Sequence, residues 1–195
     1  MSLKLNVIVT SIRPGRIGPK IGRWVADFAK ENSDFEVNLV DLADFELPLL
    51  DEPKHPAMQD YQHEHTKRWS AVNADADAYV FVSPEYDYFP AASTVNAIQT
   101  LHAEWKRKPV GLVGYGGMSG GVRAMQTTKV LMSAAGMMPL PQEVPIPFVF
   151  NFIDEAGSFE PAPEVVQGAT GMFAELASWA EALKGARAEQ VKKAA

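Results

Sequence analysis

The chain has 195 residues, a formal net charge of −6 and no cysteine. This length suits one domain with a substantial core. The acidic balance argues against a general nucleic-acid-binding protein, and the lack of cysteine excludes disulfides, thiol catalysis and thiolate metal sites. The sequence shows no signal peptide and no apolar run of membrane-spanning length, so we expect a cytoplasmic protein that binds neither nucleic acid nor membrane.

Apolar, β-branched runs alternate along the chain with segments of helical spacing. The pattern predicts strands over residues 3–9, 35–42, 78–83, 109–114 and 137–146. It predicts helices over about residues 20–31, 61–73, 91–101, 122–135 and 164–183. The longest expected loops cover residues 43–60 and 148–163.

Strands that alternate with helices predict an α/β fold, here a three-layer, doubly wound, five-stranded parallel sheet. Loops of unusual composition follow the first, third and fourth predicted strands. These three loops meet at the carboxyl edge of the sheet if the strands have the flavodoxin-like order 2-1-3-4-5, and their placement favours that order. We expect residues 1–185 to form a single domain and residues 186–195 to form a C-terminal tail.

The loop after the first strand gathers hydroxyls, glycines and cations on an otherwise acidic chain. It contains Ser11, Arg13, Arg16 and Gly18, and Pro19 lies near the first turn of the following predicted helix. A helix N-terminus offers unpaired N–H groups and a positive dipole end, and arginine adds a bidentate fork. The loop therefore predicts an anion site, with a solvated loop carrying a few surface arginines as the alternative.

The loops after the third and fourth strands have the composition of a ligand pocket. Pro84, Glu85, Tyr86 and Asp87 begin a turn rich in proline and aromatic residues, which can form the wall of a site for a flat heterocycle. The aromatic side chains could instead pack the loop or a subunit contact. Five glycines between positions 114 and 121 allow close approach of the backbone to a ligand.

Two histidines are the remaining candidate for a functional site, namely a metal site. His63 and His65 are two positions apart in a predicted helix, a spacing that directs them to different faces. No set of carboxylates is placed to complete a site with them, so we expect no metal site.

Three motifs, taken in this order, resemble the NAD(P)H-dependent FMN reductase family, which includes azoreductase-like, chromate-reducing and quinone-reducing members. The motifs are Thr10-Ser-Ile-Arg-Pro-Gly-Arg-Ile-Gly18, then Pro84-Glu-Tyr-Asp-Tyr-Phe-Pro90 with Asn96-Ala-Ile98, and Gly114-Tyr-Gly-Gly-Met-Ser-Gly-Gly121. The resemblance covers about residues 5–147. It implies a flavodoxin-like homodimer or homotetramer that binds FMN and uses NADPH or NADH as electron donor. The implied reaction passes a hydride through flavin N5 to an electron-poor acceptor, namely a free flavin, quinone, azo compound or metal oxyanion.

The resemblance also implies which residues hold the cofactor. The phosphate would be held by Ser11, Arg13, Arg16 and Gly18. The isoalloxazine would be bordered by Pro84, Glu85, Tyr86 and Asp87, and its pyrimidine side would be met by Gly116, Gly117 and Ser119. Gly121 and the start of the next helix would favour negative charge on the reduced ring. No side chain is expected to serve as a catalytic acid or base.

The chain departs from the family pattern at a few positions. Asp87 stands where the family usually has Asn, Phe89 where it has Ser, and Thr94-Val95 where it has Leu-Lys. An aspartate beside the flavin would oppose negative charge on the reduced ring and lower its potential. Two other functions remain open, a flavodoxin-type electron carrier and a non-redox nucleotide-binding or sensor protein.

Overall fold

The computed structural model describes the backbone of residues 2–194 and the side chains of residues 2–187. The parallel strands are β1 (Lys4–Val9), β2 (Glu36–Asp41), β3 (Ala78–Tyr86), β5 (Pro109–Tyr115) and β6 (Met138–Ile146). Their order is β2-β1-β3-β5-β6, and a two-residue strand, β4 (Phe89–Pro90), pairs with the end of β3. The predicted order 2-1-3-4-5 is confirmed, because β4 only adds a hairpin to the third predicted strand.

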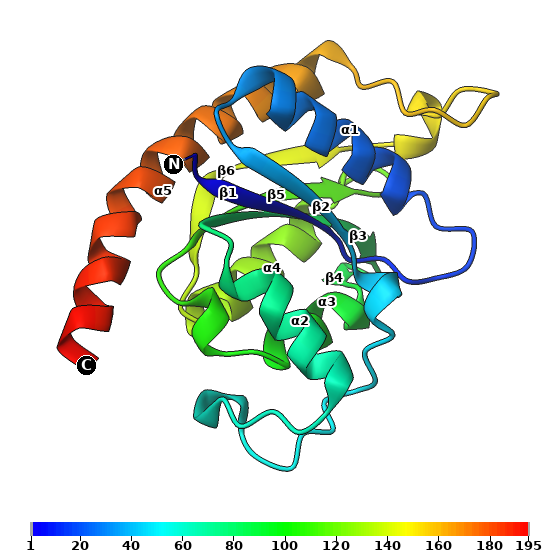
Figure 1. The fold of residues 1–195 in the computed structure, drawn as a ribbon. Coiled ribbons are helices and arrows are strands. Elements are labelled where there is room, and N and C mark those ends of the chain that lie inside the picture. The colour runs from blue at the N-terminus through cyan, green and yellow to red at the C-terminus, as the bar shows by residue number, and fades with distance from the viewer. Residues whose placement is uncertain (1, 195) are drawn as a thin grey trace.

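Helices cover both faces of the sheet (Figure 1). They are α1 (Gly18–Asn32), α2 (Glu64–Ala74), α3 (Ala92–Gln99), α4 (Val122–Ala134) and α5 (Pro163–Ala194). Side chains of α1 and α5 share one buried cluster with the sheet, and those of α2, α3 and α4 share the other. No helix within residues 2–194 is long and apolar enough to cross a membrane.

Side chains of β1 contribute to both buried clusters, because successive residues of a strand point to opposite faces of the sheet. Leu5 and Val7 pack toward α1 and α5, whereas Ile8 packs toward the opposite face, as expected for a strand buried on both sides. On that second face, the indole N–H groups of Trp69 and Trp105 each donate to a carbonyl of α3, both at 2.9 Å. These bonds fix α3, whose first turn lies at the carboxyl edge of the sheet.

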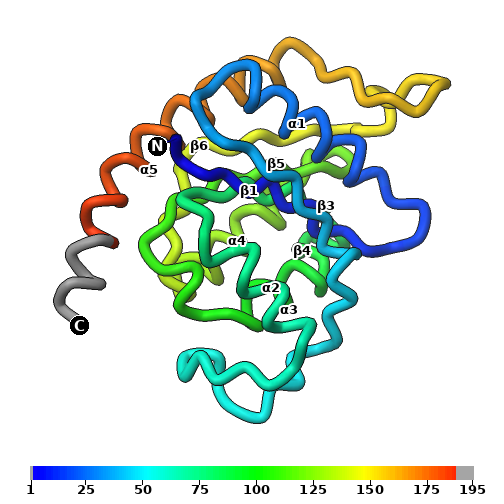
Figure 2. The backbone as a smooth tube through the Cα atoms, in the orientation of Figure 1, coloured from blue at the N-terminus to red at the C-terminus, as the bar shows by residue number. Residues whose placement is uncertain are grey.

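Several predicted boundaries shift. The predicted helix over residues 61–73 begins at Glu64, and the last helix continues beyond residue 183 to Ala194. The expected loops contain short 3-10 helices, η1 (Leu42–Phe45), η2 (Pro56–Met58) and η4 (Val149–Phe152). A further one, η3 (Ala103–Trp105), precedes β5. The segment between β2 and α2 makes a long excursion at the lower edge of the molecule, drawn in cyan in Figure 2.

Candidate functional site

Buried hydroxyl groups join the ends of β1 and β3 to the start of α3. The hydroxyl of Thr94 donates to that of Thr10 at 2.8 Å and lies 3.2 Å from that of Ser83. Ser93 donates to the carbonyl of Thr10 at 2.7 Å. Thr94, one of the departures from the family pattern, therefore fixes the sheet edge where the three unusual loops meet.

Polar side chains pack closely against the start of α1, at the end of the loop after β1. Ser11 is fully buried, and its Oγ has no hydrogen-bond partner among the described residues. A Cβ on Gly18 would lie 2.3 Å from that Oγ and 2.8 Å from the hydroxyl oxygen of Tyr115. Among the described residues, no side chain caps the N-terminus of α1. An unsatisfied hydroxyl and an uncapped helix N-terminus at one point fit an anion such as the FMN phosphate.

The two arginines of this loop differ in their surroundings. The Nη1 and Nη2 atoms of Arg16 donate to the two carboxylate oxygens of Asp41, both at 2.8 Å, and Nη1 also donates to the carbonyl of Ser11. The hydrogen bond to Asp41 raises the pKa of Arg16. Arg16 therefore fastens the loop to the end of β2. Arg13 is exposed at the outer part of the loop and forms no salt bridge within residues 2–187.

The predicted aromatic turn after β3 is a tight β-hairpin. Glu85 pairs with Pro90 and Tyr86 with Phe89, which leaves Asp87 and Tyr88 as the turn. Both turn residues have positive φ, 49° and 73°. Two-residue turns of this kind prefer Asn-Gly or Asp-Gly, because glycine adopts positive φ without strain. The tyrosine therefore occupies a position that normally takes glycine.

Glycine is required in the loop between β5 and α4. Gly121 has a φ of 91°, and a Cβ there would lie 2.6 Å from the backbone nitrogen of Tyr115. The carbonyls of Gly116 and Gly117 accept hydrogen bonds from the segment that contains η4. Gly117 is exposed, and a Cβ at that position would meet nothing within 4 Å. The segment that contains η4 therefore holds the loop on one side, while Gly117 remains exposed to solvent.

Glu85 joins the hairpin to α4. Its side chain is only 7% exposed, and its carboxylate accepts hydrogen bonds from the hydroxyl of Ser119 at 2.6 Å and from the backbone N–H groups of Arg123 and Ala124 at 3.1 and 3.3 Å. Burial alone would raise the pKa of Glu85, but these hydrogen bonds and the nearby Arg123 outweigh burial and lower it. This carboxylate caps the start of α4. The expectation that the start of α4 favours negative charge on the reduced flavin stays a prediction.

Arg123 is a residue of this region that sequence reasoning missed. Its Nη1 donates to Glu85 at 3.2 Å, and its guanidinium carbon lies 4.0 Å from the centre of the Tyr88 ring. The sequence contains no signal for this contact, because the two side chains meet only when the hairpin folds onto α4.

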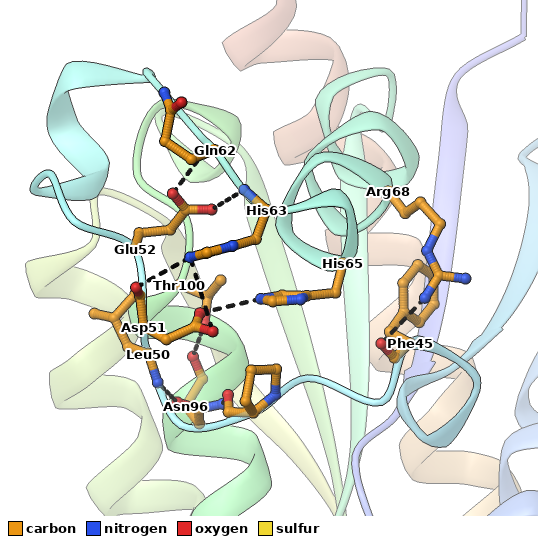
Figure 3. Close-up of polar contacts among 11 residues, drawn as sticks. Phe45, Leu50, Asp51, Glu52, Gln62, His63, His65, Arg68, Asn96 and Thr100 are labelled. Carbon is orange, nitrogen blue, oxygen red and sulfur yellow. Dashed lines mark hydrogen bonds and ion pairs between the residues drawn. The ribbon is translucent and has the colours of Figure 1, made fainter.

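The segment after β2 is fastened to two helices near the same edge (Figure 3). The Asn96 side chain of α3 donates to the carbonyl of Pro48 and accepts from the N–H of Leu50, at 2.7 and 2.9 Å. Asp51 lies between two histidines, 3.1 Å from Nε2 of His65 through Oδ1 and 3.3 Å from Nε2 of His63 through its carbonyl. An apolar cavity of about 460 Å³ lies between this segment, Ile12 and the start of α3.

The predicted orientation of the histidines is corrected here. His63 precedes α2 in an extended conformation, so its ring stacks on that of His65, with centroids 5.2 Å apart and planes 14° apart. The helical spacing rule did not apply, because only His65 is in the helix. Within the described residues, no three or more histidine, aspartate or glutamate side chains are grouped so that they could hold a metal ion.

The model of the family described as NADPH-dependent FMN reductase matches residues 3–151 of the chain. The chain belongs to this family. It is 37% identical over 182 residues to a NAD(P)H-dependent FMN reductase of Schizosaccharomyces pombe, covering 89% of this chain and 90% of the relative. It is 36% identical over 163 residues to another of Nectria sp, covering 78% and 81% of the two chains. Membership makes the chain an oxidoreductase that works with FMN and NAD(P)H.

Solved structures agree on the fold. FerB, a flavoenzyme NAD(P)H:acceptor oxidoreductase from Paracoccus denitrificans, superposes with a TM-score of 0.71 at 20% identity and covers 92% of this chain and 97% of its own. RosB, solved with a bound riboflavin-5'-phosphate derivative, gives a TM-score of 0.68 at 15% identity and covers all of this chain and 88% of its own. At these identities the likeness confirms the flavodoxin-like architecture.

Proposed function

We propose that this family member passes a hydride from NAD(P)H through the N5 atom of bound FMN to an electron-poor small molecule, such as a free flavin, a quinone, an azo compound or a metal oxyanion. The observation that carries the proposal is the unpartnered hydroxyl of Ser11, which lies against Gly18 at the start of α1. It lies at the same sheet edge as the hairpin and the glycine loop, where open α/β sheets bind their ligands.

The phosphate would be held by residues at the start of α1. Arg13 supplies an exposed guanidinium, Ser11 a buried hydroxyl, and the region of Gly18 its backbone N–H groups. Arg16 would hold the loop in place, since its guanidinium already donates two hydrogen bonds to the carboxylate of Asp41.

The flavin ring would lie between the hairpin and the glycine loop. Its neighbours in this proposal are Pro84, Glu85, Tyr86 and Asp87 on one side and Gly116, Gly117 and Ser119 on the other. The contact between Glu85 and Ser119 sets the separation of the two walls. No side chain needs to move a proton, so the protein binds and orients the cofactor and adjusts its potential.

Several large hydrophobic side chains surround this edge. Met118, Phe148 and Phe150 are all more than half exposed. An apolar rim of this kind supports assembly of the chain into a homodimer or homotetramer around the site. We further propose a cytoplasmic enzyme in which residues 1–185 form the flavin domain and residues 186–195 a C-terminal tail.

Consumption of NADPH separates the proposed enzyme from its alternatives. Protein loaded with FMN should oxidise NADPH repeatedly when a quinone is supplied, and protein stripped of flavin should not. A flavodoxin-type carrier would bind FMN without oxidising NADPH. A sensor without redox activity would be colourless as purified and would show no flavin absorbance after incubation with FMN and gel filtration.

A further inference from the structure

Arg123, in the first turn of α4, contacts the hairpin at two points. Its backbone N–H and Nη1 both bond the carboxylate of Glu85, at 3.1 and 3.2 Å. The guanidinium carbon of the same side chain lies 4.0 Å from the centre of the Tyr88 ring, well inside the range of about 6 Å for a cation–π contact. Arg123 is thus the link between the glycine-loop side and the tip of the hairpin.

The turn of the hairpin is strained at Tyr88, so a contact that holds this residue is required. A positive φ of 73° is unfavourable for a bulky side chain, so a free turn would prefer another conformation at Tyr88. Asp87, the other turn residue, is exposed. The cation–π contact with Arg123 offsets part of this strain and favours one position of the tyrosine ring. Strained residues that neighbours hold in place are concentrated at functional sites.

We propose that Arg123 is a positioning residue that holds the Tyr88 ring as a platform, on which a planar electron acceptor stacks as it enters the site. Tyr88 is 63% exposed, which leaves room for a ligand against its ring. Tyr86 and Phe89, the paired residues of the hairpin, are also exposed and extend the aromatic surface. The inference rests on the proposed function, because the platform serves acceptors of the flavin.

The first test uses flavin-free protein, so that it does not depend on the proposed function. A double-mutant cycle combines Arg123→Gln with Tyr88→Leu and follows the urea midpoint of unfolding. We expect the double variant to lose less than the sum of the two single losses, because each single change already breaks the contact. Additive midpoint shifts would overturn the inference, since the two side chains would then be independent.

The second test compares acceptors on FMN-loaded enzyme. Arg123→Gln keeps the Tyr88 ring but removes the guanidinium that holds it in place. Tyr88→Gly removes the ring, and glycine adopts the positive φ of this turn without strain. Both changes should raise the KM for a planar quinone about two- to fivefold, the factor that an exposed cation–π contact is worth in an equilibrium constant. The KM for ferricyanide, which has no flat ring, should stay unchanged in both.

Lys129→Gln is the matched control. It breaks an ion pair of the same helix, 2.6 Å from Glu143 of β6, without touching the hairpin. The control should leave both KM values unchanged. If Arg123→Gln and Tyr88→Gly raise the KM for both acceptors equally, or for neither, Tyr88 is no platform and the inference is overturned. If the wild type does not turn over NADPH at all, the proposed function fails, while the midpoint cycle still decides whether Arg123 holds Tyr88.

Discussion

The carboxylate of Glu85 accepts a hydrogen bond from the hydroxyl of Ser119 at 2.6 Å, although 34 positions separate the two residues in the chain. Glu85 is the next-to-last residue of β3, and Ser119 belongs to the glycine loop before α4. The two loops that would border the flavin are therefore one connected unit. A change at either residue should alter the stability of this unit as well as its interaction with a ligand.

Replacing Glu85 with Gln should lower the free energy of unfolding by about 1–2 kcal/mol, because a charged cap of α4 is exchanged for a neutral one. Urea unfolding at neutral pH measures the loss. Glu64→Gln is the control, since its ion pair with Lys67 lies on an exposed surface and contributes little. Equal effects of the two substitutions would show that the cap is not stabilising.

The same variant should change the dependence of stability on pH. The pKa of Glu85 is lower in the folded protein than its ordinary value, because hydrogen bonds favour the charged form despite burial. Its contribution is therefore complete above the ordinary glutamate pKa and disappears as pH falls through the lowered folded value. The difference between wild type and Glu85→Gln should shrink below about pH 4.

Arg13→Ala should weaken FMN binding by about 1.5–3 kcal/mol, the range for a hydrogen bond to a charged group. Affinity for riboflavin, which lacks the phosphate, should remain the same. Equilibrium titration of the flavin-free protein with both ligands measures the two effects. If both ligands weaken to the same degree, Arg13 does not contact the phosphate.

Asp87→Asn should raise the reduction potential of bound FMN. Asp87 is exposed at the hairpin turn beside the proposed ring position, and its negative charge opposes negative charge on the reduced flavin. A redox titration of both proteins measures the midpoint. Identical midpoints would place the carboxylate too far from the flavin, or too well solvated, to act on it.

Because of Lys108, the free energy of unfolding should increase as the pH rises into the alkaline range. The side chain is buried, and its Nζ donates to the carbonyls of Asn73 and Ala74, both at 2.9 Å. Burial lowers its pKa to about 8. The unfolded chain therefore binds more protons than the folded one between this value and the ordinary lysine pKa, so stability rises with pH across that window.

Unfolding of wild type and Lys108→Met at pH 7 and pH 10 measures this effect. The wild type should gain about 2–3 kcal/mol relative to the variant between the two values, as the linkage relation gives for a shift of this size. A constant difference would mean that Lys108 keeps its ordinary pKa in the folded protein.

The strands and helices were predictable because their periodicity is carried by neighbouring residues, and the placement of the unusual loops favoured the strand order. The loop that we propose for the phosphate was also a candidate from the sequence, since hydroxyls, glycines and arginines gather in one stretch. What Arg16 binds was not visible, because its partner Asp41 is 25 positions away at the end of another strand. The cap from Glu85 to α4 was hidden for the same reason.

Predictions from residue spacing and composition also failed where the backbone leaves the expected helical or extended conformation. His63 lies just outside α2, so helical spacing gave the wrong direction for its ring. The turn at Asp87 and Tyr88 carries no glycine, so its positive φ values could not be inferred from composition. Both features depend on contacts that form only in the folded protein.

Anaerobic mixing of the FMN-loaded protein with NADPH tests the central claim most directly. Stopped-flow absorbance follows the flavin band near its visible maximum within a single turnover. The account predicts that the band disappears with a rate that saturates in NADPH and returns on addition of a quinone. A band that persists at saturating NADPH and NADH would contradict the assignment of this site as a hydride-accepting flavin site.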